Sequence, residues 1–127
     1  MTPAEGTAMP PAPRTRQQPR ISRETAAQAA TVAGQIGLST ARVLEMLLLA
    51  YANQQITMDD CPPYIRSGID RRQLDVEIDE ELWRRADQQR KNDNMQSMGP
   101  LCERLLSAYA NETFTIGVVR TPQALVA

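Results

Sequence analysis

The hydrophobic positions of this chain form the same helical pattern twice. Residues 45–58 read EMLLLAYANQQITM and residues 103–116 read ERLLSAYANETFTI, so eight of the fourteen positions are identical. Unrelated stretches would share about one position, which identifies an internal repeat. The apolar stripe of each predicted helix is Val43, Leu44, Leu47, Leu48 and Tyr51 in the first copy, and Leu101, Cys102, Leu105, Leu106 and Tyr109 in the second.

These stripes predict two core helices. In the first copy, Met46 and Leu49 extend the apolar surface, so we expect that helix to be buried on most of its circumference.

A more polar helix precedes each core helix. In the segment ISRETAAQAATVAGQIGLST, Ser22 is an N-cap residue, alanines follow at helical spacing, and Gly37 suits the left-handed conformation that ends a helix. Ser39 then caps the first core helix. In the second half, Asp79 caps DEELWRRADQQRK, whose first turn is acidic as the helix dipole favours, and Ser97 caps the last helix. The sequence therefore predicts two pairs of helices.

A short strand is predicted before each pair. QLDVEI at 73–78 alternates polar and apolar residues, whereas the matching RQQPRI at 16–21 alternates poorly and contains Pro19. One strand cannot pair its own backbone groups, and an isolated apolar helix has no core to enter. Both problems are solved if the two strands pair and the core helices pack together. We therefore expect a mostly α fold with one short two-stranded antiparallel ribbon, built from two β-α-α repeats.

Composition suggests the limits of this domain. A chain of 127 residues is long enough for one domain with a modest core. The first residues are rich in Pro, Ala, Thr and Gln and have almost no bulky apolar side chain, which is typical of a disordered tail. The predicted organisation is a tail at 1–15, a domain at 16–116 with repeats at 16–56 and 73–114 and a linker at 57–72, and a second tail at 117–127.

Several classes of function are disfavoured by the residue types. Histidine is absent, which removes the usual general base and the commonest metal ligand. Cys61 and Cys102 form no CxxC motif, and we expect two reduced thiols, one partly exposed and one buried. No apolar run approaches the roughly 18 residues of a membrane span. We therefore expect a cytoplasmic protein that is not an enzyme and has no cofactor, metal site or membrane contact.

The formal net charge of −1 hides a strong asymmetry. Residues 14–42 carry five arginines and one glutamate, whereas residues 59–81 carry eight acidic residues and three arginines. The first half therefore offers a surface for polyanions that the net charge does not suggest.

The order of strand, helix, turn and strongly apolar helix resembles the ribbon-helix-helix superfamily of DNA-binding proteins. The turn Ile36-Gly37-Leu38-Ser39-Thr40 carries the resemblance in the first half. Members of this superfamily normally form obligate homodimers, whereas here both protomers would lie in one chain. The arrangement is similar to single-chain accessory proteins of conjugative DNA transfer, namely TraY-type relaxosome proteins and the overdrive-binding protein of the virC operon. The resemblance implies an intramolecular pseudo-dimer, monomeric as a chain, in a bacterial cytoplasm.

The resemblance also implies a binding mode. In the superfamily the ribbon lies in the major groove and its outward side chains contact base edges, while the amino ends of the second helices hold phosphates. Arginine can donate hydrogen bonds to guanine, glutamine can pair with adenine as donor and acceptor, and a carboxylate can accept a hydrogen bond from the amino group of cytosine. Carried onto this chain, the nucleic-acid-binding residues are Arg14, Arg16, Gln18, Arg20, Ser39, Thr40, Arg71, Arg72, Gln73, Asp75 and Ser97, with Glu77 also facing outward.

Two features depart from the pattern of the superfamily. Asp75 and Glu77 would place carboxylates against DNA, where they repel phosphates. The turn before Ser97 also lacks the glycine found at Gly37. We therefore expect unequal halves, with the first half providing most of the affinity.

The implied function is sequence-specific binding of double-stranded DNA, as an accessory factor in plasmid or T-DNA processing and transfer. A relaxase or a ParA-like ATPase of a transfer complex is the candidate protein partner. A transcriptional repressor or antitoxin with the same fold would differ only in the position of its DNA site. A helical protein-interaction adaptor without DNA binding is a third hypothesis, favoured by the pI near 5.4 and disfavoured by the basic first strand.

Overall fold

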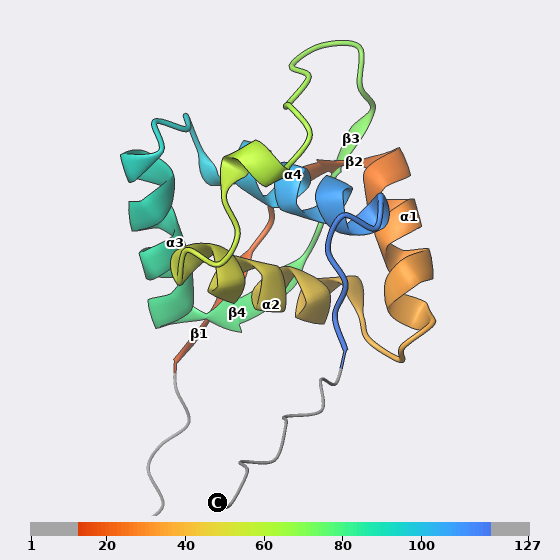
Figure 1. The fold of residues 1–127 in the computed structure, drawn as a ribbon, viewed down its shortest axis with the longest axis horizontal. Coiled ribbons are helices and arrows are strands. Elements are labelled where there is room, and N and C mark those ends of the chain that lie inside the picture. The colour runs from red at the N-terminus through yellow and green to blue at the C-terminus, as the bar shows by residue number, and fades with distance from the viewer. Residues whose placement is uncertain (1–12, 118–127) are drawn as a thin grey trace, which may run out of the picture.

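The computed structural model describes residues 13–117, which form a mixed α/β fold of helices and short antiparallel strand pairs (Figure 1). The expected tails therefore fall mostly outside the described residues. In chain order the elements are β1 (Arg14–Gln17), β2 (Arg20–Ser22), α1 (Arg23–Gly34), α2 (Thr40–Ala52), the 3-10 helix η1 (Met58–Asp60), β3 (Arg71–Gln73), β4 (Val76–Asp79), α3 (Glu80–Asn92) and α4 (Met98–Ala110).

The two predicted strands pair with each other, but in two pieces. β1 pairs antiparallel with β4, and β2 pairs antiparallel with β3. Gln17 lies opposite Val76 and Arg20 lies opposite Gln73, so two residues intervene on each side and the register continues from one pair to the next. Between the pairs, the N–H of Leu74 donates to the carbonyl of Pro19 at 2.8 Å. The expected single ribbon is interrupted here because Pro19 has no N–H to donate.

The strand pairing extends further than the sequence predicted. β1 begins at Arg14, within the expected tail, and β3 begins at Arg71, within the expected linker. Beyond the strands, the N–H of Arg23 donates to the carbonyl of Asp70 and the N–H of Glu80 donates to that of Pro13, each at 2.9 Å. The strands begin earlier than the segments 16–21 and 73–78 because cross-strand hydrogen bonds, rather than alternation within one strand, set the ends of the pairing.

The helices begin where the capping residues predicted. Ser97 precedes α4, as expected, but its side chain makes no capping hydrogen bond. Gly37 adopts φ 74°, in the left-handed region that favours glycine. Unlike Ser97, the N-cap side chains of α1, α2 and α3 each accept a hydrogen bond from a backbone N–H: Ser22 from Thr25 (3.3 Å), Ser39 from Arg42 (3.1 Å) and Asp79 from Leu82 (2.8 Å).

The core lies between the strands and the two predicted core helices, α2 and α4, which are the central helices of the fold. Both predicted apolar stripes on α2 and α4 are buried, together with the inward residues Ile21, Val76 and Ile78 of the strands. α1 packs against α4 and α3 packs against α2, so each polar helix contacts the central helix of the other half (Figure 1). Within the described part of the chain, no helix has the length and apolar character needed to cross a membrane.

Two predictions about burial were wrong. Met46 and Leu49 are 37% and 44% exposed, because α1, α3, α4 and β4 pack on the other sides of α2. Cys61 and Cys102 are both buried, whereas one was expected to be partly exposed. Burial raises the pKa of the Cys61 thiol to about 11 and that of the Cys102 thiol to about 12.

Candidate nucleic-acid interface

The paired strands present one face to the core and the other to solvent. Residues that lie opposite each other in an antiparallel pair share a face, so Arg16 lies beside Glu77 and Arg20 beside Gln73. Many of the residues expected to face outward are exposed together here. This exposed ribbon face carries Arg14, Arg16, Gln18 and Arg20 from the first strand segment and Gln73, Asp75 and Glu77 from the second.

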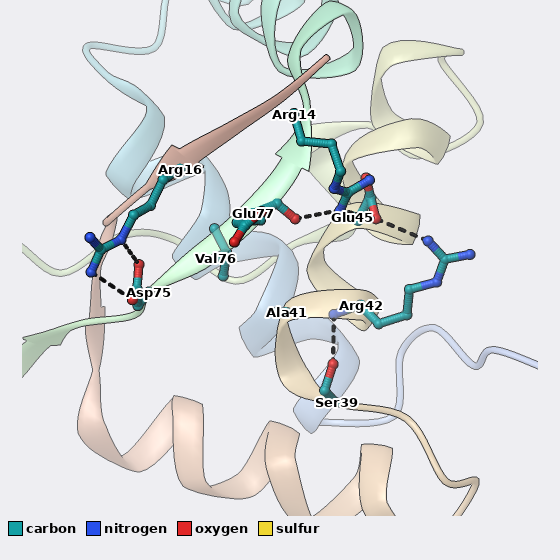
Figure 2. Close-up of a pocket in the computed structure, with 9 residues that line it drawn as sticks. All are labelled: Arg14, Arg16, Ser39, Ala41, Arg42, Glu45, Asp75, Val76 and Glu77. Atoms are coloured by element: carbon teal, nitrogen blue, oxygen red, sulfur yellow. Dashed lines mark hydrogen bonds and ion pairs between the residues drawn. The ribbon is translucent and has the colours of Figure 1, made fainter. Parts of the chain in front are cut away.

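An ion pair crosses the exposed ribbon face near its centre. Arg16 donates from Nε to Oδ1 of Asp75 at 2.7 Å and from Nη2 to Oδ2 at 2.9 Å (Figure 2). The side chains of both residues remain more than half exposed. The hydrogen bonds from Arg16 and its charge hold the pKa of the Asp75 carboxyl below its usual range.

At one end of the ribbon, Glu45 of α2 is buried against basic side chains. Its carboxylate accepts from Arg42 at 3.0 Å and from Arg14 at 3.3 Å (Figure 2). It also accepts from the backbone N–H of Asp79 at 3.0 Å. Arg14 also donates to the carbonyl of Glu77 at 2.6 Å. Burial alone would raise the pKa of Glu45, but the Asp79 N–H and the two guanidinium groups outweigh it and lower that pKa.

At the other end, Glu103 of α4 makes the corresponding contacts. It accepts from the backbone N–H of Ser22 at 2.7 Å and from Nε and Nη2 of Arg71, both at 2.8 Å. The guanidinium of Arg71 also lies 4.3 Å from the centre of the Tyr64 ring and donates to the carbonyls of Ile65 and Arg66. Arg71 was a predicted binding residue, but these contacts hold its side chain inward, whereas Arg72 is exposed.

Glu45 and Glu103 are site residues that the sequence reasoning missed. Both belong to the internal repeat and occupy identical positions in it. Each joins the central helix of its own half to an arginine of its own strand and to the strand end of the other half. The available signal was an acidic residue kept in both copies of an otherwise apolar segment.

The amino end of α2 opens beside the exposed ribbon face. Ser39 is exposed and Thr40 is half-buried there. A cavity of about 370 Å³ lies between this helix end and the ribbon. Three arginines (Arg14, Arg16 and Arg42) and three carboxylates (Glu45, Asp75 and Glu77) line it (Figure 2). Arg14 and Arg42 pair with Glu45 and Arg16 pairs with Asp75, so the cations at this positive helix end are partly neutralised.

The amino end of α4 is less basic. Ser97 is exposed there, but the residue that corresponds to Arg42 is Pro100, which has neither a charge nor a backbone N–H. Arg42 was also missing from the predicted site, although it belongs to the arginine-rich segment that the charge pattern identified. The two helix ends therefore differ in their capacity to hold an anion.

Residues 13–117 contain no cluster of three or more Cys, Asp or Glu side chains placed to hold a metal ion. Comparison with protein families, with curated proteins and with solved structures found no match to this chain.

Proposed function

We propose that this chain is a sequence-specific double-stranded DNA-binding protein of the ribbon-helix-helix type. The observation that carries the proposal is the exposed ribbon face, where arginine and glutamine side chains project from two paired strand segments. A two-stranded antiparallel ribbon fits the major groove of B-DNA. Arg16 and Arg20 supply donors for guanine, and Gln18 and Gln73 have the donor and acceptor that adenine requires.

The two halves would act as an intramolecular pseudo-dimer. The matched contacts of Glu45 and Glu103 support this arrangement, as does the packing of each polar helix against the central helix of the other half. Joining the two DNA-binding halves in one chain gives each a high effective concentration relative to the other. It also allows the residues of each half to diverge independently. The recognised DNA site therefore need not be palindromic.

Phosphate contacts would come from the helix amino ends beside the ribbon. Ser39 is the N-cap of α2 and Thr40 is its first residue. Arg42, which pairs with Glu45 but is 58% exposed, adds a cation beside the N–H groups of this first turn. Ser97 occupies the corresponding place before α4, where Pro100 replaces the cation. This difference supports unequal halves, with the first half contributing more of the electrostatic affinity.

We further propose a role in plasmid or T-DNA processing and transfer, in a bacterial cytoplasm and alongside a relaxase or a ParA-like ATPase. The resemblance of the sequence to single-chain relaxosome proteins supports this role. Binding selection on fragments of the source DNA tests it. Enrichment of origins of transfer or T-DNA borders is the expected result, whereas enrichment of promoters would favour a transcriptional repressor with the same fold.

DNA binding itself is tested by fluorescence anisotropy with duplex DNA at several salt concentrations. Binding should weaken steeply as salt rises, because phosphate contacts release counterions. The double substitution Arg16→Ala and Arg20→Ala should reduce affinity for the selected site by about tenfold or more.

The matched control replaces Arg84 and Lys91 with alanine. It removes the same charge from exposed side chains of α3 that are not part of the exposed ribbon face, and should leave site preference intact. Absence of binding by folded protein, or binding that does not respond to salt, would contradict the proposal.

A further inference from the structure

Asp75 is one of the two carboxylates that the sequence made difficult to reconcile with DNA binding, and its ion pair with Arg16 suggests a role. Arg16 lies opposite Glu77 in the register, so Asp75, two residues before Glu77, is its diagonal neighbour on the same face. Both oxygens of Asp75 accept from Arg16, at 2.7 and 2.9 Å. We propose that Asp75 is a positioning residue that orients Arg16 to bind guanine and does not itself contact a base; this inference rests on the proposed DNA binding.

The geometry of the pair leaves the recognition edge of Arg16 free. A guanidinium group has five N–H donors, and Asp75 occupies the ones on the side of the group, at Nε and Nη2. The remaining donors include one forward-pointing N–H on each terminal nitrogen. Two such parallel donors match O6 and N7 of guanine in the major groove. Figure 2 shows the guanidinium held at its side by Asp75, with its far end turned away from that carboxylate.

The pair also explains how a carboxylate on this face can favour selective binding. An exposed arginine loses rotamer freedom when it binds a base, and an arginine already held in place loses less. At the same time, the carboxylate offsets a positive charge and weakens attraction to phosphates of any sequence. Asp75 would therefore lower non-specific affinity and raise the preference for guanine.

A direct contact from Asp75 to cytosine, which the sequence suggested, would need the ion pair to break. Both carboxylate oxygens already accept charge-assisted hydrogen bonds from the same guanidinium. The structure thus favours an indirect role, in which the base contacted is guanine and the contacting residue is Arg16.

Glu77 provides a matched control on the same strand. It is exposed on the same face, but among the residues that the structure describes its carboxylate makes no hydrogen bond or ion pair. Glu77→Ala removes the same charge as Asp75→Ala and leaves the Arg16–Asp75 pair in place. Any effect of charge alone should therefore appear in both variants.

The experiment selects binding sites from a random duplex library with the wild-type protein, and then measures the affinity of each variant for single-base changes in that site. Arg16→Ala should lose the preference for one guanine. Asp75→Ala should weaken the preference for the same guanine by about tenfold and bind unrelated duplex more tightly. Glu77→Ala should also bind unrelated duplex more tightly but keep the guanine preference.

Two further variants separate positioning from a general structural effect. Asp75→Asn keeps one acceptor oxygen and should retain part of the preference. In the Arg16→Ala background, Asp75→Ala should cause no further loss at that position. Thermal unfolding should be the same for all variants, because the pair is exposed.

The inference is overturned if Asp75→Ala keeps the guanine preference, or if it alters the preference for a cytosine at another position. It is also overturned, with DNA binding intact, if Arg16→Ala loses no base preference. A wild-type protein that binds no duplex would overturn the proposed function as well, so the two failures are distinguishable.

Discussion

At the scale of single residues, Glu45 and Glu103 hold the ends of the paired strands against the central helices. Each carboxylate accepts a backbone N–H from the strand end of the opposite half and binds at least one arginine. Their surroundings differ, because the side chain of Arg71 is 9% exposed, whereas the side chains of Arg14 and Arg42 are 45% and 58% exposed. Identical residues should therefore contribute unequally to stability.

Glu103→Ala should lower the free energy of unfolding by about 3 kcal/mol, since it leaves the poorly solvated Arg71 guanidinium without its carboxylate and the buried Ser22 N–H without its acceptor. Glu45→Ala should cost less, about 1 to 2 kcal/mol, because water can solvate its arginines. Urea unfolding measures both values. Equal losses in the two variants would show that the burial of Arg71 has no energetic consequence.

The lowered pKa of Glu45 predicts a pH dependence of stability. A carboxyl group whose pKa is lower in the folded than in the unfolded protein stabilises the fold at pH values above its unfolded pKa. That contribution is lost as the pH falls through the folded pKa, below about pH 4. The difference in unfolding free energy between wild type and Glu45→Gln should therefore shrink on acidification. A difference that stays constant from neutral to acidic pH would contradict this origin.

At the scale of elements, the helix ends were predictable from sequence but their hydrogen bonds were not. Ser39 and Ser97 both lie at the N-cap position, as local sequence indicated. The Ser39 side chain accepts from the N–H of Arg42 at 3.1 Å, while the Ser97 side chain makes no such bond. Serine at matching positions therefore forms a side-chain capping hydrogen bond in one half and none in the other.

Ser39→Ala should lower the free energy of unfolding by about 1 kcal/mol, because it removes the acceptor of a first-turn N–H. Ser97→Ala is the matched control and should change stability by less than about 0.5 kcal/mol. Thermal or urea unfolding of the two variants gives the comparison. A larger loss for Ser97→Ala would mean that its hydroxyl caps α4 in solution.

The strands were less predictable than the helices. Val76 and Ile78 alternate with exposed residues and predicted β4, whereas β1 and β2 lie in a segment where Pro19 obscures the pattern. Pro19 is compatible with this pairing because its carbonyl still accepts a hydrogen bond from the N–H of Leu74, although Pro19 has no N–H to donate. Strand ends depend on a partner distant in sequence, so alternation within one segment could not locate them.

At the scale of the whole molecule, both strand pairs that the structure describes join a segment of the first half to a segment of the second. The polar helices also pack across the halves, α1 on α4 and α3 on α2. Neither half can satisfy its strand or cover its central helix by itself. The chain should therefore fold as one cooperative unit.

If these contacts form within one chain, the urea midpoint should not change over about a hundredfold range of protein concentration, because unfolding is then unimolecular. Circular dichroism at matched buffer conditions measures the midpoint. A midpoint that rises with concentration would show that the strands pair between chains. The Glu103→Ala variant provides a destabilised control in which any dependence on concentration would be easier to detect.

The residue pattern was sufficient for the helices, their caps and the two buried stripes, because helical spacing and capping act between residues close in sequence. It was not sufficient for the exposure of Met46 and Leu49, the inward position of Arg71, or the contacts of Glu45 and Glu103. These features depend on which distant elements pack together. The Arg16–Asp75 pair shows the difference most clearly: two charges 59 residues apart became neighbours through the strand register.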